Sequence, residues 1–352
     1  MENSSVLPSD APHSPQPSPI HQAFWIISLI VYCSAFVLGV AGNGLVLWVA
    51  GFRMSRTVTT VLFLNLAAAD FAFTAFLPFV ISSTVLQPHW PFGWFLCKLL
   101  SFLLVLNMFA SVFLLTLVAL DRCVSVLWPI WARNHRTPRL AALAAAGVWI
   151  FALAFSLPTF IFRTTDTEDG ITFCYFEFEN RDEAGDDEEY VDPWAEGRHW
   201  SLVLTRFSLG FLIPLIIISV CYGLLTAKLW SGMRKVRSSR PFRILTAVVA
   251  AFFLCWLPYH VVGMIEAFAH SHPQLVEVLP YLSPFSASLV FVNSCLNPLL
   301  YVFIGRDFRE KLFRSLPTAL ERALSEESAA TGTTGNSSVS APPVAVTETK
   351  IL

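Results

Sequence analysis

Seven apolar stretches dominate this chain of 352 residues, and each is long enough to cross a lipid bilayer as a helix. A spanning helix needs about 20 predominantly apolar residues, because the hydrocarbon core of a bilayer is about 30 Å thick. Only 14% of the residues are charged, whereas about 25% are charged in soluble domains. We therefore predict an all-α membrane protein, a seven-transmembrane helix bundle. The predicted spans are 24–50, 58–86, 93–127, 140–163, 199–230, 240–270 and 276–304.

Lysine and arginine are distributed unevenly between the two sides of these spans. Residues 1–52 contain neither, and the basic residues fall in alternate loops, which we assign to the cytoplasm. We expect a multi-pass plasma-membrane protein with an extracellular amino terminus and a cytoplasmic carboxyl terminus. Residues 1–23 contain no basic segment and no apolar core, so the first span is expected to direct insertion. The basic residues assigned to the cytoplasm are Arg53, Arg56, Arg133, Arg136, Arg139, Arg234, Lys235, Arg237, Arg240, Arg243, Arg306, Arg309, Lys311 and Arg314.

The segments outside the bundle (24–304) are predicted to be two tails and one short helix. Residues 1–23 form an extracellular disordered tail, in which Asn3 begins a glycosylation sequon, a pattern that also occurs by chance. Residues 305–316 alternate basic and aromatic side chains at helical spacing, which predicts an amphipathic helix on the lipids of the inner leaflet. Residues 317–352 are predicted to be a cytoplasmic disordered tail that kinases phosphorylate.

Two of the seven cysteines are predicted to lie on the oxidising side of the membrane. Cys97 is at the outer end of the third span, and Cys174 is in the second outer loop. They are expected to form a disulfide that ties this loop to the helix beneath it, and the alternative is two free thiols. The other five lie within spans or at their cytoplasmic ends: Cys33, Cys123, Cys221, Cys255 and Cys295.

The second outer loop, about 164–198, carries 13 of the 25 acidic residues of the chain, with Arg181 as the one basic residue inside the run. Two interpretations are open. Such a run is often only a solvated surface. The negative field at the mouth of a cavity would also attract a cationic partner, which favours a ligand with a basic segment.

Several polar or helix-breaking residues recur at fixed places in the spans, where ionisable groups are costly and usually functional. They include Asp70, the pair Asp121 and Arg122, and Pro258. Together with their neighbours they resemble the motifs of rhodopsin-type G-protein-coupled receptors, in order and across all seven spans. The matching segments are Gly42-Asn43, Leu66-Ala67-Ala68-Ala69-Asp70, Asp121-Arg122-Cys123, Trp149, Pro214, Tyr222, Cys255-Trp256-Leu257-Pro258 and Asn297-Pro298-Leu299-Leu300-Tyr301.

The resemblance implies an activation switch in two parts. Asp121 and Arg122 are expected to form an ion pair that holds the resting state. Once released, Arg122 would accept a G-protein helix, with Tyr222 and Tyr301 closing around it. Trp256, above the bend at Pro258, would couple the ligand pocket to an outward swing of span six. The residues assigned to coupling and activation are Asp121, Arg122, Tyr222, Trp256, Pro258, Asn297, Pro298 and Tyr301.

Asp70 lies alone in the middle of span two, where an unpaired carboxylate is costly. Resemblance to the receptor family implies an allosteric Na⁺ site around it, and no other cofactor is expected. The alternative is a protonated, hydrogen-bonded aspartic acid without an ion. The residues assigned to the Na⁺ site are Asp70, Asn107, Ser111, Asn293 and Asn297.

A narrower resemblance is carried by loop and span-end segments. They resemble the formyl peptide receptor family of leukocyte chemoattractant receptors. This implies coupling to inhibitory (Gi/o) G proteins, arrestin binding, and a role in chemotaxis or the inflammatory response. The segments are 51–60, 90–98, 134–137, 238–241 and 306–328.

The predicted pocket departs from that family, whose formyl peptide recognition relies on one aspartate and two arginines. The aspartate position is Val105, and of the arginine positions one is Leu202 and the other is Arg206. Arg206 is therefore expected to be a single counter-ion for a ligand carboxylate. The alternative is a structural ion pair between Arg206 and Glu266 or another acid of the pocket. The predicted ligand contacts are Arg206, Val105, Phe102, Phe109, His260, Glu266 and Phe291.

The preferred hypothesis is a chemoattractant receptor for an extracellular peptide. The alternatives are a receptor for a lipid acid of the resolvin or prostaglandin type, or for a chemerin-like protein, since these relatives share a neutral span three and one basic group in span five. A transporter is disfavoured, because the sequence contains no inverted repeats and no pair of broken helices. An intramembrane enzyme is disfavoured for want of a nucleophile–base pair, and no nucleic-acid partner is expected.

Overall fold

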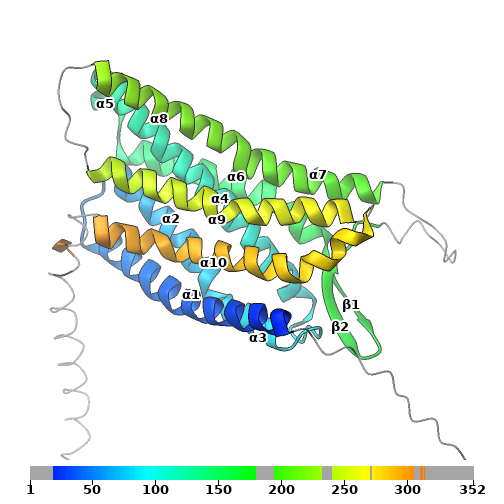
Figure 1. The fold of residues 1–352 in the computed structure, drawn as a ribbon. Coiled ribbons are helices and arrows are strands. Elements are labelled where there is room, and N and C mark those ends of the chain that lie inside the picture. The colour runs from blue at the N-terminus through cyan, green and yellow to red at the C-terminus, as the bar shows by residue number, and fades with distance from the viewer. Residues whose placement is uncertain are drawn as a thin grey trace, which may run out of the picture.

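The computed structural model describes residues 19–179, 194–231, 240–269 and 272–304, together with 310, 311 and 313. Within these residues it contains seven helical spans long and apolar enough to cross a membrane, so the predicted fold is confirmed. The spans lie side by side in one bundle (Figure 1). Most of the amino-terminal tail, the helix predicted at 305–316 and the carboxyl-terminal tail lie outside the described residues.

The helices follow one another as the apolar stretches predict, with three refinements. The second span consists of two helices, the fifth contains a turn of π-helix, and a short helix, α5, follows the third span. The bounds are α1 Pro19–Phe52, α2 Val58–Ala75, α3 Leu77–Val85, α4 Gly93–Leu127, α5 Pro129–His135, α6 Pro138–Phe162, α7 Ala195–Phe207, the π turn Ser208–Leu212, α8 Ile213–Ser231, α9 Arg240–Ala269, a 3₁₀ turn Pro273–Val278 and α10 Leu279–Ile304.

Prolines explain both irregular spans. Pro78 lies in the first turn of α3, directly after the break at Phe76, because proline has no N–H to donate and clashes with the preceding turn of a continuous helix. Pro214 follows the π turn of span five in the same way. Within that turn Gly210 packs closely on α4, where an added Cβ would lie 2.7 Å from the Cε of Met108.

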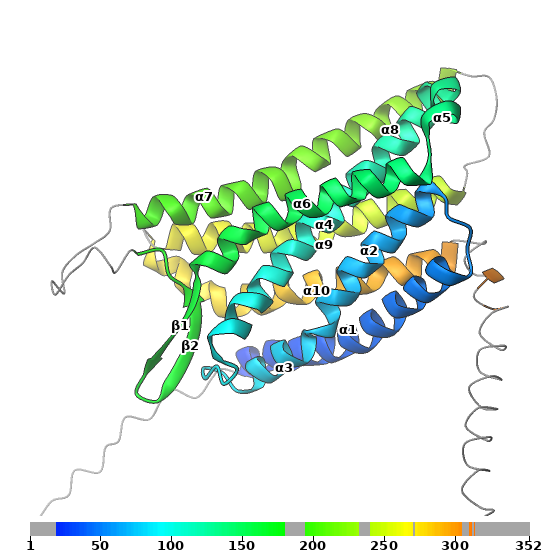
Figure 2. The ribbon, with the colours of Figure 1, turned by 180° about the vertical axis from the view of Figure 1, so that it is seen from behind.

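The centre of the bundle is apolar and closely packed around α4, which runs through the middle in both views (Figures 1 and 2). The largest fully buried side chains are Trp256, Phe109 and Phe252. On the outside, Leu143 and Leu254 are 70% and 71% exposed. Apolar side chains on the outer face as well as in the core are what a lipid environment requires.

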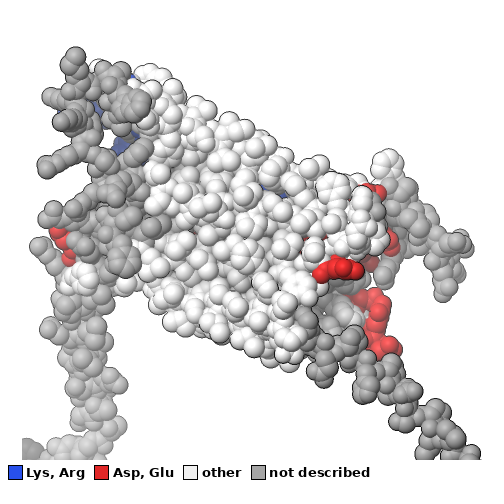
Figure 3. All heavy atoms as spheres, viewed as in Figure 1, with Lys and Arg blue, Asp and Glu red and all other residues white. Residues whose placement is uncertain are grey.

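A β-hairpin covers one end of the bundle. Strand β1 (Arg163–Glu168) pairs antiparallel with β2 (Ile171–Phe176), and Asp169 and Gly170 turn the chain with positive φ angles of 50° and 78°. We call this the hairpin end; α5 marks the opposite end, the α5 end (Figure 2). Acidic side chains gather at the hairpin end, beside a broad face of the helices that carries almost no charge (Figure 3).

The predicted disulfide is confirmed. Cys97 of α4 is bonded to Cys174 of β2, and the backbone N–H of Trp90 donates to the carbonyl of Thr172 at 2.7 Å. Next to Cys97, the ammonium group of Lys98 donates to the carbonyls of Phe160 and Ile161, each at 3.1 Å. These bonds fix the hairpin over the ends of α4 and α6.

Candidate functional site: a cavity under the hairpin

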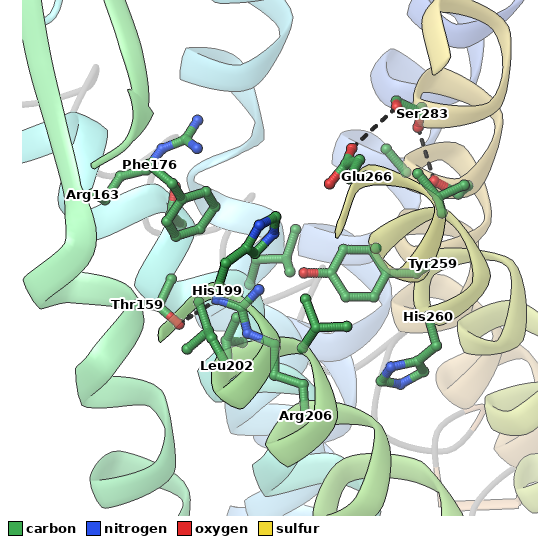
Figure 4. A pocket seen from close by; sticks show the side chains of 18 of the residues that line it. Thr159, Arg163, Phe176, His199, Leu202, Arg206, Tyr259, His260, Glu266 and Ser283 are labelled. Atoms are coloured by element: carbon green, nitrogen blue, oxygen red, sulfur yellow. Dashed lines mark hydrogen bonds between the residues drawn. The ribbon is translucent and has the colours of Figure 1, made fainter. Parts of the chain in front are cut away.

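A cavity of about 320 Å³ opens at the hairpin end. Its size is at the lower end of the range of roughly 300–1,000 Å³ that is typical of ligand pockets. Five helices and both strands contribute to its wall (Figure 4). The lining residues are Ser101, Leu104, Val105, Thr159, Arg163, Phe176, Phe178, His199, Leu202, Val203, Arg206, Tyr259, His260, Val262, Gly263, Glu266, Ser283, Ser286 and Ala287.

Arg206, in the last turn of α7, is a buried cation on this wall, with 9% of its surface exposed. One guanidinium nitrogen donates to the hydroxyl of Thr159 at 2.7 Å, and the guanidinium carbon lies 5.5 Å from the ring centre of Phe176. Its Nε has no hydrogen-bond partner in the structure. A buried donor without a partner is costly, so Arg206 is suited to bind an anion that enters the cavity.

The expected alternative, an ion pair between Arg206 and Glu266, is not formed. Glu266 accepts a long hydrogen bond of 3.5 Å from the hydroxyl of Ser283. In Figure 4 the carboxylate lies across the cavity from Arg206 and Phe176, with the His199 ring between them in this view and the Tyr259 hydroxyl directed toward Arg206. The acid and the base therefore occupy facing walls.

Arg163 is a second cation on the cavity wall that the sequence reasoning missed. Its guanidinium carbon lies 4.6 Å from the centre of the Phe176 ring, and the guanidinium donates to the carbonyl of Cys174 at 3.0 Å. Burial lowers the pKa of Arg163 to about 10, so the side chain still carries its charge at neutral pH. The available signal was its position, immediately after the fourth apolar stretch and at the start of the acidic loop.

Two further predicted contacts reach the cavity. Val105, with 1% exposed, contributes an apolar patch in place of the family's aspartate. His260 is buried, and its Nε2 has no partner in the structure. The His260 ring packs against the rings of Phe207 and Phe211, with centroids 5.8 and 5.2 Å apart, so packing accounts for most of its surroundings.

Two phenylalanines of α4 that were predicted to contact the ligand pack inside the bundle. Phe102 packs against Phe160, with ring centroids 6.0 Å apart, and Phe109 is fully buried against Phe155 at 5.6 Å; neither lines the cavity. Helical phase accounts for Phe102, whereas Phe109 lies one turn further along α4 than Val105 and is buried below the cavity. Successive residues of an α-helix are about 100° apart, and α4 presents the face of Ser101, Leu104 and Val105.

Phe291, a third predicted ligand contact, also packs inside the bundle. It stacks on Phe73, with centroids 5.2 Å apart, and meets the edge of Tyr32 at 4.9 Å. It therefore joins α1, α2 and α10 in the core and does not line the cavity.

Directly beneath the cavity, aromatic rings form a column along α9. Tyr259 lines the cavity and lies 5.4 Å from Trp256, and Trp256 lies 5.8 Å from Phe252, measured between ring centroids. Trp256 is fully buried, two residues before Pro258, which lies inside the helix. Tyr259 is thus connected to the core through the rings of Trp256 and Phe252.

The polar group around Asp70 is assembled in the middle of the bundle. The amide of Asn297 donates to the Asp70 carboxylate at 2.8 Å. With its amide turned to the orientation that satisfies both ends, Asn107 donates to the other carboxylate oxygen at 3.3 Å and accepts from the hydroxyl of Ser294 at 3.1 Å. Ser294 was not predicted. The signal for it was its place one turn from Asn297 and beside Asn293 in span seven.

The remaining predicted members of this group are Ser111 and Asn293. Both are buried, and neither the hydroxyl of Ser111 nor the amide nitrogen of Asn293 has a partner in the structure. One carboxylate with several neutral oxygens is a donor set that suits a small monovalent cation, so these residues fit the expected ion.

At the α5 end the expected ion pair between Asp121 and Arg122 is not formed. Asp121 instead binds Arg136, the residue after α5, through two bonds of 2.7 and 2.9 Å, and this hydrogen bonding raises the pKa of Arg136. Arg122 donates to the hydroxyl of Thr59 at 2.7 Å. Neighbouring helix residues point in directions about 100° apart, so Asp121 faces α5 while Arg122 faces α2.

The other predicted switch residues lie along the spans. Tyr222 of α8 is partly buried against the core. Pro298 packs closely on α1, where an added Cβ on Gly42 would lie 3.0 Å from the proline ring. The side chain of Tyr301 lies outside the described residues.

The sequence model of the family described as "7 transmembrane receptor (rhodopsin family)" matches residues 42–301. The chain belongs to this family. It is 51% identical to human "N-formyl peptide receptor 2" over 325 residues, covering 90% of each chain. It is 46% identical to human "N-formyl peptide receptor 3" over 352 residues, or 97% and 98% of the two chains. Mouse "Formyl peptide receptor 2" is 49% identical over 329 residues, or 92% and 93%.

The chain is thus a G-protein-coupled receptor of the formyl peptide receptor group, the chemoattractant group that the loop segments indicated. Rhodopsin-family receptors are not enzymes, and they need no resident cofactor. Seven spanning helices in a receptor of this family make it a multi-pass plasma-membrane protein. The transporter and enzyme hypotheses are set aside on this evidence.

Proposed function

We propose that this receptor binds an extracellular peptide whose carboxylate pairs with Arg206, and that it signals through Gi/o proteins in leukocyte chemotaxis or inflammation. The observation that carries the proposal is the buried guanidinium of Arg206, which faces the cavity with an unpartnered Nε. A ligand carboxylate would supply the missing acceptor and the counter-charge in one group.

The hairpin end is proposed to face outward. The Cys97–Cys174 disulfide needs an oxidising compartment, and the basic loop residues favour the cytoplasm. The amino-terminal tail, with glycosylated Asn3, is then extracellular. The helix at 305–316 would lie on inner-leaflet lipids, and the phosphorylated tail 317–352 would bind arrestin.

Signal transfer is proposed to follow the aromatic column. Movement of Tyr259 on ligand binding would shift Trp256, and span six would swing about the bend at Pro258. Arg122 would exchange its bond to Thr59 for a G-protein helix. Tyr222 and Tyr301 would then close around Arg122 from spans five and seven.

An allosteric Na⁺ ion is proposed to bind at Asp70. Asn107, Ser111, Asn293 and Asn297 would complete its surroundings. The support is the chemistry of the site, a single buried carboxylate among neutral groups, one of which is the unpartnered hydroxyl of Ser111. The ion would stabilise the resting arrangement and lower agonist affinity.

A lipid acid, of the resolvin or prostaglandin type, is the second candidate ligand, and a chemerin-like protein is a third. The observation that favours a lipid is the apolar wall beside Arg206, made by Leu104, Val105, Leu202 and Val203. Formyl peptide binding, which the relatives' names record, is less favoured here, because Val105 and Leu202 remove two of the three charged anchors of that group.

The test is inhibition of cyclic AMP formation, with and without pertussis toxin, in cells that express the receptor. Formylated peptides, basic peptides with a free carboxyl end and long-chain fatty acids are applied to the wild type and to Arg206→Ala at matched surface expression. A toxin-sensitive response to the basic peptides that is lost in Arg206→Ala supports the proposal. A response only to fatty acids selects the second candidate, and silence in all three classes rejects both.

A further inference from the structure

The charges of the cavity are arranged as two cations facing one anion. Arg163 and Arg206 lie on the wall formed by β1 and α7, and Glu266 lies on the opposite wall, on α9 (Figure 4). A ligand that carries only a carboxylate pairs with the arginines and leaves the charge of Glu266 without a partner. The arrangement therefore constrains the tip of the ligand more tightly than Arg206 alone.

The two arginines are held as a pair by Phe176. Their guanidinium carbons lie 4.6 and 5.5 Å from the centre of its ring, which is within the range of cation–π attraction. Arg206 is further held by Thr159, and Arg163 by the carbonyl of Cys174. Among the residues that the structure describes, neither guanidinium pairs with a carboxylate. A nearby anion stabilises two like charges so placed.

Glu266 is equally short of a counter-charge. It is exposed to the cavity, and the bond from Ser283 to its carboxylate is long, at 3.5 Å. No lysine, arginine or histidine among the described residues forms an ion pair with it. Tyr259 lies on the same helix as Glu266 and lines the same cavity, where it offers an aromatic ring that a cation can contact.

We propose that the cavity recognises a peptide that ends in a lysine or arginine with a free carboxylate. The terminal carboxylate binds Arg206, Arg163 adds a second positive charge from the other side of Phe176, and the side-chain cation binds Glu266 across the cavity. This inference rests on the proposed function, since it takes Arg206 as the anion anchor. A cavity of about 320 Å³ accommodates the end of a peptide and not its body, and the acidic residues around the hairpin, such as Glu168 and Asp169, favour a basic body outside.

Other tips leave a charge unmatched. A fatty acid would place a hydrocarbon chain against Glu266, and burying a carboxylate without a partner is costly. A formylmethionyl end carries neither a carboxylate nor a cation. A terminal basic residue is the smallest peptide tip that matches both walls.

The test uses four peptides that differ only at the last residue: arginine acid, arginine amide, glutamine acid and glutamate acid. Potency is measured as cyclic AMP inhibition, and affinity by competition with a labelled arginine-acid peptide on membranes. On the wild type, amidation and the change to glutamine are each expected to lower affinity about tenfold or more, the effect of losing one charge-assisted pair.

Variants then assign each preference to a wall. Glu266→Gln should abolish the preference for arginine over glutamine and keep the preference for acid over amide. Arg163→Gln should weaken only the preference for acid over amide. Glu266→Arg should bind the glutamate-ended peptide better than the arginine-ended one, a gain that a merely misfolded variant cannot produce.

The outcomes separate this inference from the proposed function. If the peptides act through Arg206 but Glu266→Gln leaves the arginine preference intact, the terminal-basic inference is overturned and the proposed function stands. If Arg163→Gln leaves the acid-over-amide preference unchanged, the two-arginine site is overturned. If no peptide acts on the wild type, both fall.

Discussion

Two cavities of similar size lie at opposite ends of the described bundle, and they differ in whether their arginines are paired with an acid. At the α5 end a cavity of about 290 Å³ contains Asp121 and Arg136, which neutralise each other through two bonds. At the hairpin end Arg163 and Arg206 have no acidic partner among the described residues, although Glu266 lies across the same cavity. The difference indicates that Arg136 stabilises the fold, whereas Arg163 and Arg206 are available to a ligand.

Among the changes that test this difference between the two ends, replacement of Arg206 should have the largest effect, on ligand potency. Arg206→Gln is expected to raise the EC50 of a basic peptide with a free carboxylate about 30-fold or more, since truncating one partner of a desolvated charge pair typically costs about 2–5 kcal/mol. Cyclic AMP inhibition at matched surface expression is the measurement. Leu204→Ala, an exposed change on the same helix, is the control, and equal potencies for the two variants would show that Arg206 is structural.

Asp70 lies between the two ends and should show an intermediate effect. Replacing Na⁺ in the medium with an organic cation should raise agonist affinity of the wild type about five- to tenfold, the low end of allosteric coupling. In Asp70→Asn the affinities in the two media should be equal, because the carboxylate that binds the ion is gone. Persistence of the Na⁺ effect in the variant would exclude Asp70 as the ion site.

Arg136 should prove structural. Arg136→Ala leaves the mostly buried carboxylate of Asp121 without its bidentate partner, and about 1–2 kcal/mol of stability should be lost, less than for a fully buried pair because both side chains keep some contact with solvent. The apparent melting temperature of the purified receptor should fall, whereas Arg139→Ala, an exposed neighbour, should not change it. A large loss of ligand affinity in Arg136→Ala at the same surface expression would contradict the contrast between the two ends.

The smallest effect is expected at Thr59. Thr59→Val removes the acceptor of Arg122, a bond of about 0.5–1.5 kcal/mol, so basal signalling should rise about two- to tenfold. Ser125→Ala, whose hydroxyl bonds a carbonyl within α4, is the matched control. Basal cyclic AMP inhibition unchanged by Thr59→Val would mean that Thr59 does not restrain Arg122.

The sequence predicted the spans and the disulfide because each follows from a local property. Apolar length marks a span, and the compartment selects Cys97 and Cys174. Pairings between side chains were harder to predict. Asp121 and Arg122 are neighbours in sequence, yet each bonds a different helix, and the true partner, Arg136, comes from a short helix whose position depends on tertiary packing.

The residues that line the cavity were hard to predict for a related reason. Apolar spans carry no polar face that would reveal their rotation, so the sequence does not show that Phe102 points away from the cavity. Nor does it show how deep the cavity reaches, which leaves Phe109 below its floor. Charged residues were placed better, because few charges fit in a span and each must face the interior. Arg163 was missed because it follows the span, and a single basic residue in a loop does not indicate a cavity contact.

The π turn Ser208–Leu212 has a mechanical consequence for span five. A π turn accommodates one residue more than an α-helical turn, so side chains on its two sides are offset by about 100° relative to an uninterrupted helix. The span therefore consists of two helical segments whose side-chain directions are set separately. One segment positions Arg206 and the other positions Tyr222. Deleting a single residue within the turn would rotate the segment that carries Arg206 about the helix axis and leave the segment that carries Tyr222 in place. Ligand choice can therefore change through this turn without a change in the surface that contacts the signalling partner.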